Sequence, residues 1–331
     1  MNKSNLLVGL TYDLRSDYLA AGYSLEETAE FDKPDTIEGL ENSLHELGFR
    51  TERIGNAKAL VSALAANRRW DIVFNIAEGM YGVARESLVP ALLDAYQIPY
   101  TFSAPDVLVV ALDKALTKTI VRDASVATAP FACIRTTTDI AKIKLPFPLF
   151  LKPIAEGTGK GISSRSRVTT PEELRAVATD LLARFKQPVL VETFLPGREF
   201  TVGLAGSDAS TEVLGAIEVN FKSGSGNIYS YETKTDYEKL VTYTVPHDAT
   251  AQIACDVALA AWRALRCVDG GRIDVRCDDA GQPNFIEVNP LAGLNPTHSD
   301  LPILCRMNGM DYTSLISRIM THALHRHGLK K

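Results

Sequence analysis

Residues 270–289 read GGRIDVRCDDAGQPNFIEVN, and two alternating segments flank a short polar turn in this stretch. The segments are Arg272–Cys277 and Asn284–Asn289, and the turn is Asp-Asp-Ala-Gly-Gln. Alternation on both sides of a glycine-containing turn predicts a β-hairpin.

The register of this hairpin follows from the position of its turn, which we place between Ala280 and Gly281. Side chains alternate between the two faces of a strand, so residues two apart share a face. Two carboxylates and an amide oxygen beside a guanidinium suit Mg²⁺ that carries phosphates. The predicted register pairs Arg272 with Asn289 and Asp274 with Glu287, and puts all four on one face.

The alternative is that these charges simply form the solvated face of an amphipathic hairpin, because one face of an antiparallel sheet commonly meets water. On either interpretation the opposite face is apolar and consists of Ile273, Val275, Ile286 and Val288. The rest of the chain must decide between the two.

The composition is that of a globular enzyme with two or three subdomains in 331 residues. The net charge of −5 gives no general attraction to nucleic acid or anionic membranes. No apolar run approaches the ~20 residues of a bilayer span, and Leu6–Leu10 is too short for a secretory segment. Five cysteines without C-x-x-C spacing favour buried thiols in a reducing compartment, so we expect a cytoplasmic protein.

The first hundred residues show a strand–helix–strand rhythm typical of a small parallel α/β unit. We expect strands at Leu6–Leu10 and Ile72–Ile76 and helices at Thr36–Leu47 and Glu86–Ala95. The long acidic segment Arg15–Asp35 is either a functional loop or a mobile insertion.

A second and a third unit follow from about Ala104. Thr170-Pro171-Glu172-Glu173 predicts the start of a helix that extends to Phe185. Further helices are predicted at Asp113–Asp123, at Ile253–Arg266 and around an apolar stripe that starts at Tyr312, and further strands at Pro146–Lys152, Pro188–Glu192, Glu199–Ala205 and Thr211–Asn220.

A glycine-rich loop, Lys152–Gly161, follows one of these strands directly. Glycines at 157, 159 and 161 would let backbone N–H groups approach phosphate oxygens, and Lys152 would add a positive charge. The loop matches neither the Walker A nor the Rossmann pattern. Alone, it is compatible with a plain connection.

The segment Val189–Phe200 runs from an apolar strand through Glu192 and a Pro-Gly turn to Glu199. Its backbone and apolar groups are suited to an adenine ring, and Glu199 would be free to accept hydrogen bonds from ribose hydroxyls. A strand–turn–strand connection with surface acids is the simpler alternative.

The order of these motifs resembles that in the ATP-grasp superfamily, and most closely that in its D-alanine–D-alanine ligase group. The motifs are a strand-Lys-glycine loop, E-x-x-x-x-G-x-E-F, and R-x-D…E-x-N, and the resemblance covers roughly residues 72–325. It implies a mixed α/β (α+β) ATP-grasp fold with an N-terminal Rossmann-like domain. The implied division is an N-terminal domain at 1–103, a central subdomain with the phosphate loop at 104–192 and a C-terminal subdomain with the metal site at 193–331.

The resemblance also implies ATP and two Mg²⁺ ions as cofactors, with Mn²⁺ as a substitute. The residues that would bind the two Mg²⁺ ions are Asp274, Glu287 and Asn289. The residues that would hold the nucleotide are Lys114, Lys152, Glu156, Gly157, Gly159, Glu192, Thr193, Phe194, Leu195 and Glu199.

Four residues would take part in catalysis by the same resemblance: Arg272 and the Gly293 N–H at the oxyanion, Thr158 in the phosphate loop, and Lys234 in the loop Lys222–Lys239 that closes over the terminal phosphate. Ser299 would contact the carboxylate of the second substrate. Glu30 is the candidate for the amine of the first substrate, with Glu26 and Glu27 as neighbours of nearly equal merit.

Three departures from the family pattern lie in the amino-acid-binding part. Thr235 stands where D-alanine-specific members have tyrosine, Leu10–Asp35 replaces their N-terminal glycine-rich segment, and Asn75-Ile76-Ala77-Glu78-Gly79 replaces their His-Gly segment. ATP use is therefore expected, whereas the identity of the substrates stays open.

The expected reaction is ATP-dependent ligation of a carboxylate to an amine through an acyl phosphate, with release of ADP and phosphate. The expected substrates are two amino acids, and the family resemblance suggests a homodimer. Alternatives are a ligase for a different amino acid or amine in the biosynthesis of a small peptide or natural product, and a non-catalytic nucleotide-binding regulator. A catalytic cysteine or a general base at His298 is a weaker alternative, since structural roles are commoner for both.

Overall fold

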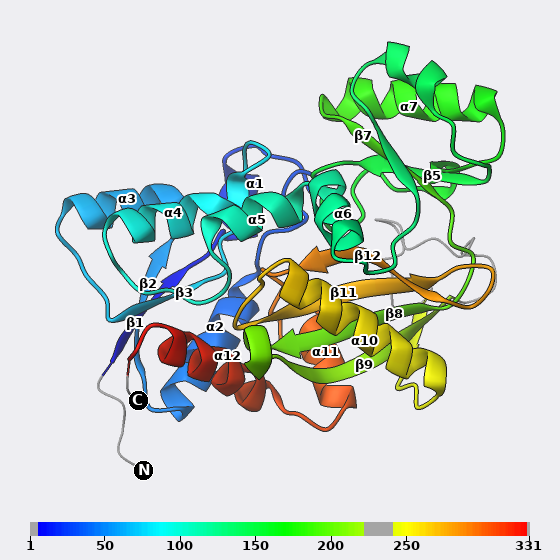
Figure 1. Cartoon of the computed structure of the whole chain (residues 1–331). Coiled ribbons are helices and arrows are strands. Elements are labelled where there is room, and N and C mark those ends of the chain that lie inside the picture. The colour runs from blue at the N-terminus through cyan, green and yellow to red at the C-terminus, as the bar shows by residue number, and fades with distance from the viewer. Residues whose placement is uncertain (1–5, 222–240, 330–331) are drawn as a thin grey trace.

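Three β-sheets organise the chain in the computed structural model, which describes residues 6–221 and 241–329 (Figure 1). The predicted closing loop with Lys234 and Thr235 lies outside the described residues. Within those two ranges, no helix combines the length and the apolar character that a bilayer span requires.

The N-terminal sheet is parallel, as predicted, with the strand order β2-β1-β3. Helix α2 begins at Pro34, two residues before the predicted start, because proline suits the first turn of a helix. The elements of this part are β1 (Leu7–Thr11), α1 (Arg15–Ala20), α2 (Pro34–Glu46), β2 (Arg50–Gly55), α3 (Ala57–Ala65), β3 (Ile72–Asn75), η1 (Arg85–Ser87) and α4 (Leu88–Ala95); β2 and α3 were not predicted.

The middle sheet is antiparallel, with the order β4-β7-β5-β6, and α7 (Pro171–Phe185) packs on it as a separate lobe in Figure 1. Helix α7 begins as predicted, since the Thr170 hydroxyl accepts the Glu173 N–H at 3.2 Å. Strand β5 begins at Leu149 and not at the predicted Pro146; prolines at 146 and 148 lack the N–H that a ladder needs. The other elements are β4 (Phe131–Ile134), η2 (Thr137–Lys142), β5 (Leu149–Pro153), η3 (Ser164–Ser166), β6 (Arg167–Val168) and β7 (Val189–Thr193).

The C-terminal sheet has the order β10-β9-β8-β11-β12 and carries the hairpin at one edge. Helix α10 begins at Ala249, four residues before the predicted Ile253, because the Asp248 side chain caps it by accepting the Ala251 N–H at 3.0 Å. The elements are β8 (Glu199–Ala205), η4 (Asp208–Ser210), β9 (Glu212–Phe221), β10 (Val241–Thr244), α10 (Ala249–Ala264), β11 (Gly270–Cys277), β12 (Pro283–Asn289), α11 (Asp300–Met307) and α12 (Tyr312–Arg326).

The hairpin β11–β12 has the predicted register at its functional end, where Arg272 pairs with Asn289 and Asp274 with Glu287. The register then shifts, so that Val275 pairs with Phe285. The predicted pairing is therefore wrong beyond Asp274. This β-bulge reverses the faces of two neighbours. Phe285 enters the core and is fully buried, whereas Ile286, which was predicted for the apolar face, lines a cleft.

The solvated-face alternative for the hairpin is wrong. All of β11 is buried, and its charged residues are at most 9% exposed. The charged face of the hairpin therefore lies inside the molecule. The buried charged residues of this strand are Arg272, Asp274 and Arg276.

Helices α5 (Pro105–Leu112) and α6 (Lys114–Asp123) pack with the C-terminal sheet, through Val107, Ala111 and Val121. Another core cluster joins α2 to α11 and α12, so the first and last parts of the chain share one core. Figure 1 shows α2 and α12 side by side near the C-terminus. The division at 103 and 192 stays a prediction.

Candidate active site

Two neighbouring hollows lie between the N-terminal part of the chain, the middle lobe and the C-terminal sheet. The larger, which we call the main cavity, has a volume of about 560 Å³ and is bounded by the segment 29–33, the glycine-rich loop and the hairpin. The smaller, the interlobe cleft, lies between the middle and C-terminal sheets. Lys114, Glu156 and Glu287 line both hollows and therefore mark their junction.

The interlobe cleft collects most of the residues predicted to hold the nucleotide. These are Lys114, Lys152, Glu156, Gly159, Glu192, Thr193, Phe194, Leu195 and Glu199. Phe150, Ile162 and Ile286 add an apolar lining that sequence reasoning missed. A cleft with apolar walls and three lysines, Lys114, Lys152 and Lys160, fits a nucleotide base and its phosphates.

Glu192 is buried between two lysines. Its carboxylate is 2.9 Å from Lys152 Nζ and 2.8 Å from Lys118 Nζ. Although burial works against its charge, the two ammonium groups lower the pKa of Glu192 to about 2. The carboxylate thus stays ionised and fixes Lys152 in the cleft. Lys118 was predicted only as a residue of helix α6, without a role.

Glu199 is not free, contrary to the expectation from its sequence. Its carboxylate accepts a hydrogen bond from Arg276 Nη1 at 2.9 Å, and both side chains are nearly buried. A charge-assisted pair of this kind fixes the direction of the carboxylate. One Glu199 oxygen is therefore engaged before any ribose arrives.

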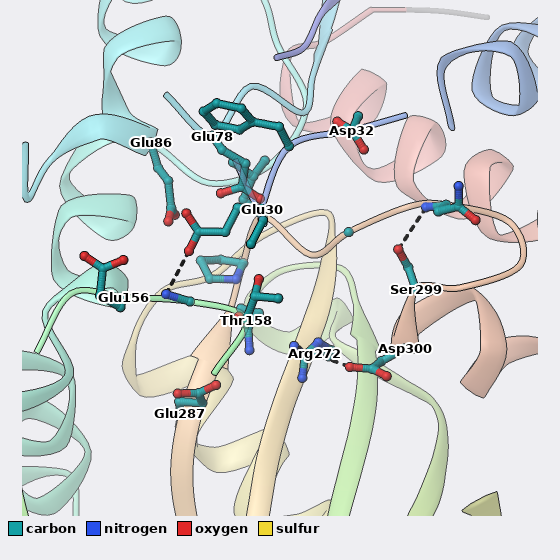
Figure 2. A pocket seen from close by; sticks show the side chains of 18 of the residues that line it. Glu30, Asp32, Glu78, Glu86, Glu156, Thr158, Arg272, Glu287, Ser299 and Asp300 are labelled. Carbon is teal, nitrogen blue, oxygen red and sulfur yellow. Dashed lines mark hydrogen bonds and ion pairs between the residues drawn. The ribbon is translucent and has the colours of Figure 1, made fainter. Parts of the chain in front are cut away.

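The glycine-rich loop adopts left-handed backbone conformations at Thr158 (φ 53°), Gly159 (φ 71°) and Gly161 (φ 76°). The Gly157 N–H, predicted to face phosphate, instead donates to Glu30 Oε1 at 2.8 Å (Figure 2). A Cβ at Gly157 would overlap this carboxylate, which explains the glycine there.

Arg272 lies at the floor of the main cavity between two acids. Its Nη1 donates to Asp274 at 2.7 Å, and its Nη2 lies 3.6 Å from Asp300 Oδ2. Asp274 also accepts from the Thr201 hydroxyl at 2.9 Å. Although burial opposes its charge, these carboxylates raise the pKa of Arg272, which stays a cation. Asp300, which starts α11, was not predicted.

The three predicted metal ligands are hard donors that lie around the junction of the two hollows. Glu287 lines both, Asp274 lines the cleft and Asn289 lines the main cavity. The Asn289 Nδ2 atom is buried and has no hydrogen-bond partner among the described residues. Two carboxylates and an amide so placed fit Mg²⁺ that carries phosphates. Across residues 6–221 and 241–329, no three His, Cys, Asp or Glu side chains gather as ligands for one ion.

The segment after β12 forms the opposite wall of the main cavity. Gly293 and Ser299 line it, as does His298. The Ser299 hydroxyl accepts the Asn295 N–H at 3.0 Å and so closes a turn ahead of α11. The hydroxyl keeps its own proton for another acceptor.

Four carboxylates form an acidic wall on the N-terminal side of the main cavity: Glu30, Asp32, Glu78 and Glu86 (Figure 2). Burial and the nearby Glu86 carboxylate raise the pKa of Glu78 well above its usual value. Burial raises the pKa of Glu86 to about 7 and, together with Asp13, that of Asp32 to about 8. Glu78 follows β3, and ligand sites in parallel sheets lie beyond the carboxyl ends of strands, so this signal was available in the sequence.

Glu30 differs from the other three acids because its charge is compensated. Arg85 Nη2 lies 3.1 Å and Lys160 Nζ 3.3 Å from its Oε2 atom. Among the described residues, neither Glu78 nor Glu86 forms an ion pair with a distance of 4 Å or less. Glu78 and Glu86 thus differ from the predicted Glu30, and their raised pKa values favour the protonated form.

The cysteines are unsuited to nucleophilic catalysis. All five are free, and burial raises the pKa of each thiol. A thiol held in its neutral form is a poor nucleophile. None of the five lines the main cavity.

Comparison with known proteins gives one consistent match. The family model described as the D-ala D-ala ligase C-terminus matches residues 120–321. An uncharacterised protein, y4sG, of Sinorhizobium fredii is 32% identical over 86% of this chain and 86% of its own length. The D-alanine–D-alanine ligase of Aquifex aeolicus is 32% identical over 86% of this chain and 94% of its own, and that of Bordetella petrii is 30% identical over 86% and 85%.

Solved structures show the same fold at lower identity. The D-alanine–D-alanine ligase from Bacillus anthracis complexed with ATP aligns with a TM-score of 0.73 and 20% identity over 98% of this chain and 99% of that one. The VanG D-Ala:D-Ser ligase from Enterococcus faecalis aligns with a TM-score of 0.74 and 17% identity over 97% and 100%. The predicted mixed α/β ATP-grasp fold is thereby confirmed.

Proposed function

The chain belongs to the D-alanine–D-alanine ligase family, and from that premise we propose that it joins two amino acids in an ATP-dependent reaction through an acyl phosphate. The observation that carries this proposal is the junction of the two hollows. Lys114, Glu156 and Glu287 line both, so a nucleotide in the cleft would present its terminal phosphate to a substrate in the main cavity.

The first step is transfer of the terminal phosphoryl group of ATP to a carboxylate, and it mainly requires that the two groups are correctly oriented. A carboxylate oxygen of the first amino acid attacks the terminal phosphorus of ATP, the bond to the bridging oxygen breaks, and ADP leaves. Positioning and charge neutralisation do most of this work. Lys152 and Lys114, with the Thr158 loop, would hold the phosphates. Asp274, Glu287 and Asn289 would hold Mg²⁺, which neutralises phosphate charge when bound.

In the second step the amine of the second amino acid attacks the acyl carbon, and phosphate leaves. Negative charge develops on the acyl oxygen, and the Arg272 guanidinium with the Gly293 N–H would stabilise it. Loss of one such donor typically costs ~100–1000-fold in rate. Ser299 would bind the carboxylate of the second substrate, and the Lys234 loop would exclude water from the acyl phosphate.

The acidic wall would receive the ammonium group of the first amino acid. Because Glu30 is already compensated by Arg85 and Lys160, Glu78 and Glu86 are acids of the wall whose ionised form a bound ammonium group would favour. This favours the alternative that the substrate pair differs from two D-alanines. We infer that a first amino acid with a further polar or basic group on its side chain suits this wall.

The test is a pairwise panel of D- and L-amino acids, with basic ones included, assayed for ADP release in the presence of Mg·ATP. We expect release that requires two amino acids, with a preference at the first position. A non-catalytic nucleotide-binding protein would bind Mg·ATP and release no ADP with any pair. That result would reject the ligase proposal.

Two further proposals concern the whole chain. We infer a homodimer, as the family resemblance suggests, and the division into domains at 103 and 192. Sedimentation of the purified protein tests the first, and limited proteolysis at the two boundaries tests the second.

A further inference from the structure

Arg85 is a buried guanidinium that lines neither the main cavity nor the interlobe cleft. It lies on η1, between β3 and α4, and is 7% exposed. Its Nη1 donates to the Ala155 carbonyl oxygen at 3.0 Å, and its Nη2 donates to Glu30 Oε2 at 3.1 Å. Arg85 thus connects the N-terminal segment directly to the start of the glycine-rich loop.

Glu30 completes the connection from the other side. Its Oε1 accepts the Gly157 N–H at 2.8 Å, and Lys160 Nζ lies 3.3 Å from its Oε2. The loop is therefore held at three points within six residues: the Ala155 carbonyl, the Gly157 N–H and the Lys160 ammonium. We call Arg85 and Glu30 with these three groups the loop latch.

The far side of the loop is tied to the middle sheet. The Gln187 side chain accepts the Ala155 N–H at 2.7 Å and donates to Glu156 Oε1 at 2.7 Å. Lys160 pairs with Glu156 Oε2 at 2.7 Å. Since Thr158 and Gly159 have left-handed backbones, the free chain would visit other conformations, and these contacts help to select this one.

The charges of the latch depend on one another. Although burial opposes ionisation of both groups, Arg85 lowers the pKa of Glu30 and Glu30 raises that of Arg85. Removing one partner of a buried pair leaves an uncompensated charge on the other. Glu78 and Glu86 lie beside the pair, and the loss of Arg85 would remove a cation that favours the ionised form of all three acids.

We propose that Arg85 is a positioning residue, which acts through Glu30 and Ala155 to hold the glycine-rich loop in its phosphate-binding conformation. The proposal rests on the proposed function, in that this loop receives the nucleotide phosphates. It also gives Glu30 a second task beside the predicted contact with the substrate amine. The N-terminal part that binds the first amino acid would then set the conformation of the nucleotide site.

The test measures binding of Mg·ADP by calorimetry, together with the KM values for ATP and for the amino acids. The variants are Arg85→Met, Arg85→Lys and Glu30→Gln, and the double variant of Arg85→Met with Glu30→Gln. Arg184→Met is the matched control, because Arg184 is about half exposed and pairs with Glu26 at 3.8 Å between the same two parts of the chain.

Arg85→Met should weaken Mg·ADP binding about tenfold, a shift of ~1.4 kcal/mol, and raise the KM for ATP more than that for either amino acid. Arg85→Lys should restore part of this loss, because it keeps the charge beside Glu30. The double variant should lose less than the sum of the two single changes, since both break one unit. Arg184→Met should bind as the parent does.

An unchanged Mg·ADP affinity in folded Arg85→Met protein would overturn the proposal, as would additive losses in the double variant. If Arg85→Met does not fold, Arg85→Lys provides the test alone. An unchanged ratio of the KM for ATP to the KM for the amino acids would then overturn the proposal. Failure of the ligase proposal can be distinguished from failure of the proposal for Arg85. The parent would then release no ADP in the presence of amino acids, while the calorimetric comparison still tests the latch.

Discussion

At the scale of single residues, the site is dominated by buried charges, and most of their partners come from distant parts of the chain. Glu192 has two lysines, Glu30 has Arg85 and Lys160, and Arg272 has Asp274 and Asp300. Glu78 and Glu86 form no such ion pair among the described residues. Burial of an acid without a cation favours its protonated form, which couples the acidic wall to pH.

The first prediction concerns Glu86, whose pKa burial raises to about 7. The unfolded chain releases this proton near pH 4.3, so between about pH 4.5 and 7 the folded state binds more protons. The free energy of unfolding should therefore fall as pH rises through this window, by roughly 1–3 kcal/mol from this group. Glu86→Gln removes the ionisation and should flatten the profile.

Urea unfolding at several pH values between 5 and 8 provides the measurement. The exposed Glu38 supplies the control, and Glu38→Gln should leave the pH profile as it is in the parent. If the free energy of unfolding varied with pH in the same way for the parent and for Glu86→Gln, Glu86 would have the same pKa in the folded and unfolded states, and the prediction would be wrong.

At the scale of elements, the bulge in the hairpin β11–β12 decides which side chains reach the nucleotide. It places Phe285 in the core and Ile286 in the interlobe cleft. Without the bulge the two residues would exchange faces, because strand side chains alternate.

Two adjacent substitutions therefore should have different consequences. Phe285→Ala should cost about 3–5 kcal/mol of unfolding free energy, since a fully buried ring is lost. Ile286→Ala should instead weaken Mg·ADP binding about fivefold, as expected for the loss of ~1 kcal/mol of apolar contact, with a smaller effect on stability. Denaturant unfolding and calorimetry of both variants give the comparison, and a reversed pattern would contradict the register.

At the scale of the whole molecule, the N-terminal part, the middle lobe and the C-terminal sheet each supply one wall, and Glu287 lines both hollows. Its carboxylate lies 3.6 Å from Lys114 Nζ, at the boundary of the main cavity and the interlobe cleft. A change at this point should affect the reaction without disturbing any one core, because Glu287 belongs to none of the clusters of buried apolar residues.

The prediction at this scale is that Glu287→Gln lowers kcat at least about 100-fold, because several kcal/mol of charge stabilisation through Mg²⁺ are lost. EDTA should abolish amino-acid-dependent ADP release, and added Mg²⁺ should restore it. Glu212→Gln, on the same sheet in a surface ion pair with Arg318, should keep the parental rate. Full activity of Glu287→Gln would remove this residue from the proposed metal set.

The sequence by itself determined many of the elements, although not β2 or α3, and much of the site. Period-two alternation predicted the register of Arg272 with Asn289, and the order of three motifs predicted the ATP-grasp fold, because both signals are local in the chain. The cleft residues from Glu192 to Leu195 lie at the end of strand β7 and directly after it, so their proximity follows from their neighbouring positions in the chain.

Only the tertiary structure decided the contacts between parts far apart in the chain. It showed that Glu30 holds Gly157, that Arg85 compensates Glu30, that Arg276 engages Glu199, and that the hairpin carries a bulge. The packing of the sheets decides which charged side chains come into contact. This packing depends on the burial of apolar side chains in all the cores together. A local sequence pattern therefore does not predict these long-range contacts.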